Sequence, residues 1–112
     1  RTDDLRGAPS LDIIDGLLAG GASIRVYDPV AGLRLRERYG DKIQVLSKYY
    51  SAIEGADALA VLTEWNEFRR PDYQRMRELM RGKAIFDGRN LYTPAVMQEQ
   101  GFDYFSIGRM PV

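Results

Sequence analysis

Short apolar runs alternate with helical segments along this sequence, and that alternation limits the fold more than any other feature. We expect strands at residues 23–27, 43–46, 58–62, 84–86 and 104–107. The run at 58–62 is apolar throughout, which is typical of a central strand in a parallel sheet. Strands that alternate with helices pair in parallel through right-handed crossovers. The predicted class is therefore α/β, with a three-layer, doubly wound, mainly parallel sheet of the Rossmann-like type.

The expected helices begin at capping residues and end at glycines. Their predicted first residues are Ser10, Asp28–Pro29, Ser47, Asp72 and Thr93–Pro94. A doubly wound unit normally opens with a strand, whereas this sequence opens with a charged loop at residues 1–9 and a helix. We therefore expect a piece of a longer chain, whose first strand lies ahead of Arg1 or comes from another chain.

Composition narrows the chemistry that the chain supports. Its 112 residues suit a single domain, residues 1–112. Lys plus Arg and Asp plus Glu are both 16, which argues against a nucleic-acid partner bound by bulk positive charge. The absence of Cys and His excludes a thiol nucleophile, a histidine base and a cysteine-based metal site. We see no membrane span and no signal peptide, so we expect a cytoplasmic protein.

The segment at residues 84–90 is the strongest candidate site. Its apolar run ends in Asp87, Gly88, Arg89 and Asn90, and ligands of open α/β sheets bind where strands end. The guanidinium of Arg89 suits a phosphate or a carboxylate. Pairing of Arg89 with Asp87 or another carboxylate explains the same residues equally well.

Other polar clusters follow predicted strands, at residues 2–6, 27–28 and 63–65, so we expect them on the same edge of the sheet. Asp28 resembles an acid that binds a ribose, but a helix cap explains both Asp28 and Pro29 and is favoured. From the residues alone, Arg6 is most simply an exposed loop charge. No G-x-G-x-x-G fingerprint is present.

A series of motifs gives a more specific resemblance that covers nearly the whole chain. The sequence is similar to the C-terminal, UDP-binding domain of the UDP-glucose/GDP-mannose dehydrogenase family, and within it most resembles the UDP-glucose 6-dehydrogenase branch. The motifs are Thr2-Asp3-Asp4-Leu5-Arg6, Tyr27-Asp28-Pro29, Ala56-Asp57-Ala58, Thr63-Glu64-Trp65 with Phe68, Phe86-Asp87-Gly88-Arg89-Asn90, Gly101-Phe102 and Ile107-Gly108-Arg109.

The resemblance implies a domain of an oxidoreductase that converts UDP-glucose to UDP-glucuronate with NAD⁺, in polysaccharide biosynthesis. It implies that Arg89 contacts the UDP-sugar and that Arg6 reaches NAD⁺, which an N-terminal domain mainly binds. It also implies a dimeric parent enzyme. The family's catalytic cysteine, a substrate-contacting lysine and a central strand all lie ahead of the matching segment. We therefore expect no catalytic residue here and no activity from this chain alone.

Two alternatives remain beside this interpretation. One is a GDP-mannose or UDP-N-acetylhexosamine dehydrogenase domain, which Thr63-Glu64-Trp65 disfavours by resemblance. The other is a non-enzymatic α/β nucleotide-binding or interaction module.

Overall fold

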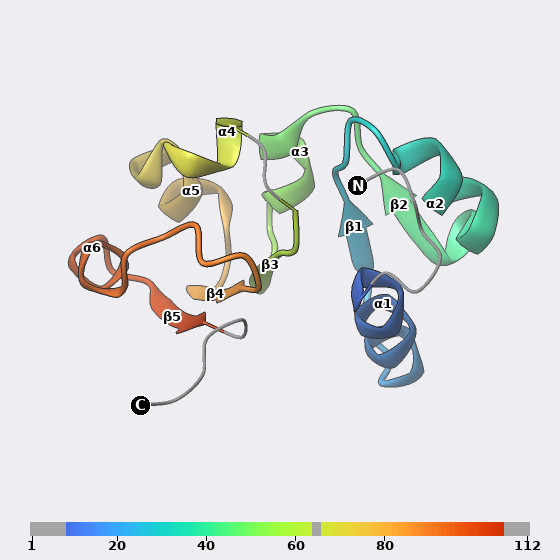
Figure 1. The fold of residues 1–112 in the computed structure, drawn as a ribbon, viewed down its shortest axis with the longest axis horizontal. Helices are drawn as coiled ribbons and strands as arrows, with labels where there is room; N and C mark the ends of the chain where they lie inside the picture. Colours follow the sequence, from blue (N-terminus) through green and yellow to red (C-terminus); the bar gives the residue numbers. More distant parts are fainter. Residues whose placement is uncertain (1–8, 64–65, 107–112) are drawn as a thin grey trace. The chain divides into compact units, whose positions relative to one another are not determined.

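The computed structural model describes residues 9–63 and 66–106, and the chain divides into two compact units (Figure 1). The first unit comprises Arg1–Ala52 and the second comprises Ile53–Val112. The predicted residues Arg6, Glu64 and Trp65 lie outside the described residues. Each unit is described by itself below.

The first unit is built on a two-stranded parallel sheet with helices packed against it. Ile24, Arg25 and Val26 of β1 pair in parallel with Ile43, Gln44 and Val45 of β2. Apolar side chains from both helices and from β2 form its core. The elements are α1 (Pro9–Ala19), β1 (Ile24–Val26), α2 (Gly32–Tyr39), the 3₁₀ turn η1 (Gly40–Lys42), β2 (Ile43–Val45) and α3 (Tyr49–Ile53), whose last residue is the first of the second unit. The core residues are Leu11, Ile14, Ala31, Leu35, Tyr39 and Ile43.

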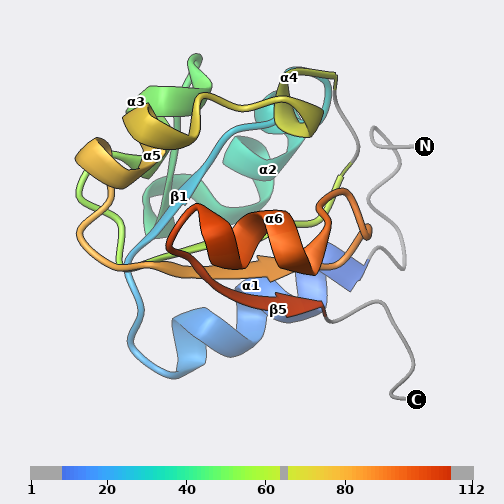
Figure 2. The ribbon, with the colours of Figure 1, turned by 90° about the vertical axis from the view of Figure 1, so that its left-hand side faces the viewer.

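The second unit is built on a three-stranded sheet in the order β3-β4-β5, and both pairings are parallel. Figure 2 shows α6 lying alongside β4 and β5. Within this unit the chain alternates strand and helix, as the sequence pattern predicts. The elements are β3 (Ala58–Val61), α4 (Asn66–Arg69), α5 (Tyr73–Leu79), β4 (Ala84–Asp87), α6 (Pro94–Glu99) and β5 (Asp103–Ser106).

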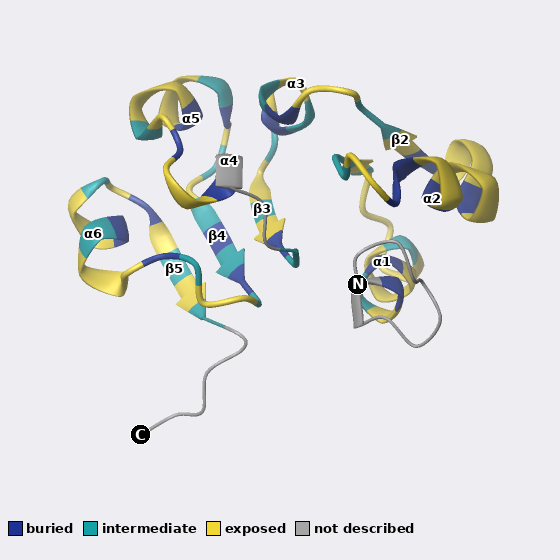
Figure 3. Cartoon of the chain, turned by 45° about the horizontal axis from the view of Figure 1, so that its top comes forward, coloured by how far each residue is buried: buried dark blue, intermediate teal, exposed yellow. Residues whose placement is uncertain are grey.

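Three side chains at the centre of the second unit are completely removed from solvent. Met76 of α5, Ile85 of β4 and Met97 of α6 are each 0% exposed, and Figure 3 shows buried positions on these same elements. Two of the three are methionines, whose flexible side chains fill irregular gaps between a sheet and its helices. Apolar packing therefore holds the central strand β4 in place, independently of the polar residues at its end.

The prediction of an α/β Rossmann-like class is confirmed, because parallel strands alternate with flanking helices. One predicted side-chain cap is also present. Oδ1 of Asp72 accepts a hydrogen bond from the backbone N–H of Arg75 at 3.1 Å, at the start of α5. The cap predicted at Asp28 is wrong, because Ala31 is the N-cap of α2; Oδ1 of Asp28 instead accepts hydrogen bonds from the N–H groups of Val30 and Ala31 in the preceding turn, both at 2.9 Å.

The structure differs from the sequence prediction in the starts of three helices and in the presence of a fourth. Helix α1 begins at Pro9, so the predicted cap Ser10 lies within it, and α3 begins at Tyr49 rather than directly after Ser47. Helix α2 begins at Gly32 rather than at Pro29, because Asp28 closes a turn ahead of the helix. The short helix α4 lies in a segment that the apolar pattern left as a loop. None of the described helices is long and apolar enough to cross a membrane.

The connection from α5 to β4 is fastened to the start of β3. The backbone N–H groups of Arg81 and Gly82 donate to the carbonyl oxygen of Ala56 at 2.8 and 3.1 Å. The Arg81 guanidinium binds both carboxylate oxygens of Asp57, at 2.6 and 2.8 Å, and this hydrogen bond holds the pKa of Asp57 below its usual value. A Cβ atom on Gly82 would overlap the backbone carbonyl of Asp57. The approach of the two segments therefore requires glycine at position 82.

We predict that Gly82→Ala destabilises the chain by about 1–3 kcal/mol, the usual cost of forcing extra atoms into a packed site. The measurement is the free energy of unfolding from chemical denaturation followed by circular dichroism. Gly16→Ala is the matched control, because a Cβ at this exposed position of α1 meets nothing within 4 Å. Since alanine favours the helix, the control should gain about 0.5–1 kcal/mol. Equal stability of Gly82→Ala and the wild type would contradict the steric argument.

Candidate functional site

The carboxyl edge of the second unit's sheet gathers the residues that follow its strands. Val61, Asp87 and Ser106 end β3, β4 and β5, and they lie side by side in parallel register. The backbone N–H of Gly88 donates to the carbonyl oxygen of Val61 at 2.9 Å, which extends the pairing one residue beyond β4. The segment that carries Arg89 therefore leaves the sheet at the edge where parallel α/β sheets bind ligands.

Asp87 organises the loop after β4. Its side chain is 0% exposed, and it is a charged residue at the end of a buried strand. Oδ1 accepts a hydrogen bond from the backbone N–H of Arg89 at 2.9 Å. Oδ2 accepts from the backbone N–H of Tyr92 at 3.0 Å and from the Tyr104 hydroxyl at 2.8 Å. A buried carboxylate needs such donors, so burial of Asp87 forces the loop to turn its N–H groups inward.

Two residues of β5 also contact this loop. The Tyr104 hydroxyl lies between Oδ2 of Asp87 and the carbonyl oxygen of Tyr92, 3.2 Å from the latter, and its proton serves the shorter contact to Asp87. The Ser106 hydroxyl donates to Oδ1 of Asn90 at 2.7 Å. Asn90 has a φ of 56°, in the left-handed region that asparagine tolerates better than most residues. Hydrogen bonds therefore hold the loop at three successive points, Arg89, Asn90 and Tyr92.

The side chain of Arg89 is exposed at this edge, while its backbone N–H is held by Asp87. An exposed guanidinium on a fixed backbone suits an anion with two acceptor oxygens, such as a phosphate or a carboxylate. Thr63, from the predicted cluster at 63–65, follows the adjacent strand β3 and is partly buried. Asp28 follows β1, which belongs to a sheet separate from β3-β4-β5, so the expectation of one shared sheet edge is wrong for this residue. Its Oδ1 accepts two backbone N–H groups of the turn ahead of α2, which is a structural role. Among the described residues, no group of three potential metal-ligating side chains is found.

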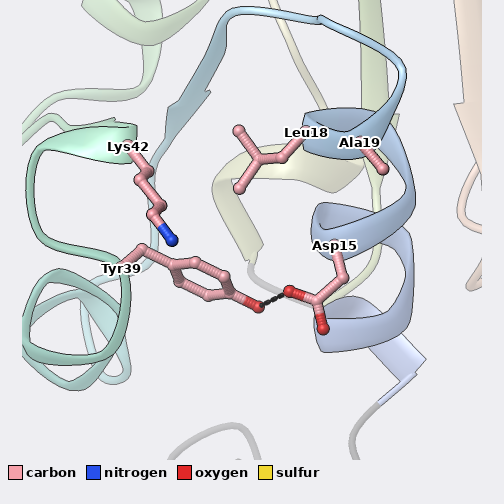
Figure 4. Close-up of a pocket in the computed structure, with 5 residues that line it drawn as sticks. All are labelled: Asp15, Leu18, Ala19, Tyr39 and Lys42. Atoms are coloured by element: carbon pink, nitrogen blue, oxygen red, sulfur yellow. Dashed lines mark hydrogen bonds between the residues drawn. The ribbon is translucent and has the colours of Figure 1, made fainter.

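A hollow lies on the first unit, and its described lining includes no predicted site residue. It is lined by Asp15, Leu18, Ala19, Tyr39 and Lys42 (Figure 4). The Tyr39 hydroxyl donates to Oδ1 of Asp15 at 2.8 Å, and Asp15 and Lys42 are exposed. Burial, and secondly the hydrogen bond to Asp15, raise the pKa of Tyr39 above 10. This hydrogen bond joins α1 to α2, so Tyr39 and Asp15 have a structural role.

Comparison with known proteins identifies the family of the chain. The model of the UDP-glucose/GDP-mannose dehydrogenase family, UDP binding domain, matches residues 1–94. The chain belongs to this family. The match includes the candidate loop with Asp87 and Arg89, and also the segment around Arg6.

Relatives in the UDP-glucose/GDP-mannose dehydrogenase family include enzymes from distant bacteria. The chain is 48% identical to the UDP-glucose 6-dehydrogenase of Pseudomonas aeruginosa, over 96% of this chain and 25% of that protein. It is 38% identical to the UDP-glucose 6-dehydrogenase TuaD of Bacillus subtilis, over 99% of this chain and 24% of that protein. The chain therefore spans about a quarter of the length of these relatives.

A solved structure supports the fold assignment. The UDP-D-ManNAc dehydrogenase of Pyrococcus horikoshii matches with a TM-score of 0.54 over 88% of this chain and 30% of that chain. At 24% sequence identity, this likeness supports the Rossmann-like fold alone. It agrees with the parallel pairings seen in each unit.

Sequence reasoning found Arg89 and Asp87 but missed the residues that hold their loop. Tyr92, Tyr104 and Ser106 carry no motif, and β5 follows the loop by more than ten residues. Parallel pairing of β4 with β5 was the one available signal, because it predicts that residues after β4 meet the last residues of β5. The exact partners depend on register, which the sequence pattern did not define.

We predict that Asp87→Asn lowers the free energy of unfolding by about 1.5–3 kcal/mol, because hydrogen bonds to a charged acceptor are lost and an amide N–H faces other donors. Chemical denaturation measures this loss. Asp103→Asn is the control, since Asp103 is exposed on β5 of the same unit and should change stability by less than about 0.5 kcal/mol. Equal effects of the two variants would show that Asp87 does not organise the loop.

We predict that the chain loses stability as the pH rises above 10, in part through Tyr39. The raised pKa keeps its proton in the folded state, while the unfolded chain releases it near 10. The stabilisation is therefore complete below pH 10 and declines as the pH approaches the folded pKa. Unfolding curves recorded at increasing pH should show a shallower decline for Tyr39→Phe. Asp15→Asn should give an intermediate slope, because burial of Tyr39 remains; an unchanged slope in Tyr39→Phe would exclude this residue as the cause.

Proposed function

We propose that residues 1–112 form the UDP-sugar-binding domain of an NAD-dependent UDP-glucose 6-dehydrogenase, which oxidises UDP-glucose to UDP-glucuronate. The observation that carries this proposal is the exposed Arg89, fixed by a buried Asp87 at the carboxyl edge of a parallel sheet. The family match and the identity to UDP-glucose 6-dehydrogenases support it. Arg89 binds the anionic nucleotide-sugar.

The role of this chain in the reaction is binding rather than bond chemistry. Arg89 donates hydrogen bonds to anionic oxygens of the substrate, and Asp87 holds the backbone N–H of Arg89 in place. The nicotinamide cofactor accepts hydride in such an enzyme. This sequence has no G-x-G-x-x-G fingerprint, so the main cofactor site would lie elsewhere in the parent enzyme. Arg6 would supply one contact to the cofactor bound there. With no Cys or His, the chain alone should bind nucleotide but reduce no NAD⁺.

The proposed setting is a cytoplasmic, dimeric parent enzyme, of which this chain is one domain. The relatives that match over nearly all of this chain are about four times its length, which supports its place as one domain of a longer enzyme. Initial rates of NADH formation by the parent on a panel of nucleotide sugars identify the substrate. UDP-glucose should be oxidised fastest. Faster turnover of GDP-mannose or of a UDP-N-acetylhexosamine would assign another branch of the family, and no turnover of any sugar would favour a non-enzymatic module.

A pair of arginine variants of the parent enzyme tests the two proposed contacts. We predict that Arg89→Ala weakens UDP-glucose binding by about 1.5–3 kcal/mol, the contribution of a charged hydrogen bond, and leaves NAD⁺ binding unchanged. Arg6→Ala should weaken NAD⁺ binding and leave UDP-glucose binding unchanged. Calorimetric titration of both ligands measures all four effects. Arg89→Lys should recover part of the affinity, because lysine keeps the charge but loses the two-pronged geometry.

The control for this pair is Arg70→Ala, which removes another exposed arginine from the second unit. It should bind both ligands as the wild type does. If Arg89→Ala binds UDP-glucose with wild-type affinity, the proposed substrate contact is wrong. If Arg6→Ala binds NAD⁺ normally, only the cofactor contact is lost from the proposal.

A further inference from the structure

We propose that Tyr104 and Ser106 of β5 are positioning residues for the nucleotide-sugar site, because they hold the loop on which Arg89 reaches the ligand. This inference rests on the proposed contact between Arg89 and a nucleoside diphosphate sugar. It assigns a part in recognition to a strand that carries no recognisable binding motif.

The first argument is the place of Tyr104 in the hydrogen-bond network. Its hydroxyl donates to Oδ2 of Asp87 at 2.8 Å, and the other oxygen of that carboxylate accepts the backbone N–H of Arg89 at 2.9 Å. Tyr104 therefore acts on Arg89 through one intermediate side chain. The ring of Tyr104 also packs edge-on against Tyr92, with centroids 6.4 Å apart, so both the ring and the hydroxyl limit movement of the carboxylate.

The second argument is that Ser106 holds the other side of Arg89. Its hydroxyl donates to Oδ1 of Asn90 at 2.7 Å, and Asn90 has a φ of 56°. The chain is therefore fixed immediately after Arg89 as well as at its own N–H. Asn90 is exposed, so its hydrogen bond adds little to the stability of the fold. Its main effect is on the conformation of the loop.

A restrained backbone on both sides of Arg89 lowers the entropy lost on binding. An arginine side chain loses conformational freedom when it binds, and a mobile backbone would add to that loss. With its neighbours tied to β5, Arg89 samples fewer orientations before the ligand arrives. Loosening either tie should weaken binding only as long as the guanidinium is there to be positioned.

A double-mutant cycle in the full-length parent tests this dependence, with UDP as the titrated ligand. We expect Tyr104→Phe and Ser106→Ala each to weaken UDP binding by about 3- to 10-fold, the usual effect of one lost hydrogen bond. In an Arg89→Ala background the same changes should alter UDP affinity by less than about 2-fold, because residues that act through each other are not additive. A merely structural role would weaken binding equally in both backgrounds.

Tyr39→Phe is the matched control, because it also removes a tyrosine–aspartate hydrogen bond of 2.8 Å, here in the first unit. It should leave UDP affinity unchanged. Ser106→Ala keeps the test decisive if Tyr104→Phe folds poorly, since the Ser106 hydrogen bond is exposed. Equal losses with and without Arg89 would overturn the inference.

Amide hydrogen exchange separates this inference from the proposed function. In the absence of any ligand, Tyr104→Phe should speed exchange at the N–H groups of Arg89 and Tyr92, whose acceptor is Asp87. If wild-type parent binds no UDP but exchange accelerates, the substrate proposal fails and the positioning of the loop stands. If UDP binds normally and exchange at both amides stays at the wild-type rate, Tyr104 does not hold the loop and the inference is wrong.

Discussion

The buried carboxylate of Asp87 is the interaction on which the second unit's functional edge depends. A charged group that is 0% exposed must find donors within the protein, and it finds two backbone N–H groups and a tyrosine hydroxyl. Those donors come from the loop after β4 and from β5. Satisfying one buried charge therefore determines how the chain turns after β4 and how β5 is joined to that turn.

Apolar packing supports this arrangement in addition to the hydrogen bonds. Ile85, two residues ahead of Asp87, is completely buried, and β4 lies between two parallel neighbours. The end of β4 is therefore a rigid point from which a short loop can leave in a defined direction. Sites supported by rigid strands present their side chains more reproducibly than sites on free loops. The same close packing explains why Gly82 is required where the α5–β4 connection crosses the start of β3.

The sequence was sufficient for features with a local cause. Apolar runs predicted the strands, and Asp72 predicted a cap that the structure shows, because a capping carboxylate acts on an N–H group three residues away. Features with a distant cause were missed. The contacts of Tyr104 and Ser106 depend on the register of β5 against β4, which no local pattern reports. The sequence predicts the start of α2 at Asp28–Pro29, ahead of its true start at Gly32, because an aspartate–proline pair also suits a turn that precedes a helix.

The structure also changes the choice that the sequence left open at Arg89. The sequence allows two interpretations of this side chain, a pairing with Asp87 or another carboxylate and a contact for an anion. Asp87 instead binds the backbone N–H of Arg89, and its remaining hydrogen bonds go to Tyr92 and Tyr104. Asp87 therefore acts on the backbone of residue 89, and this contact is compatible with a binding role for the exposed guanidinium. A motif in which aspartate precedes arginine by two residues can serve both purposes, because a carboxylate reaches the N–H two residues ahead while the longer side chain extends beyond the sheet.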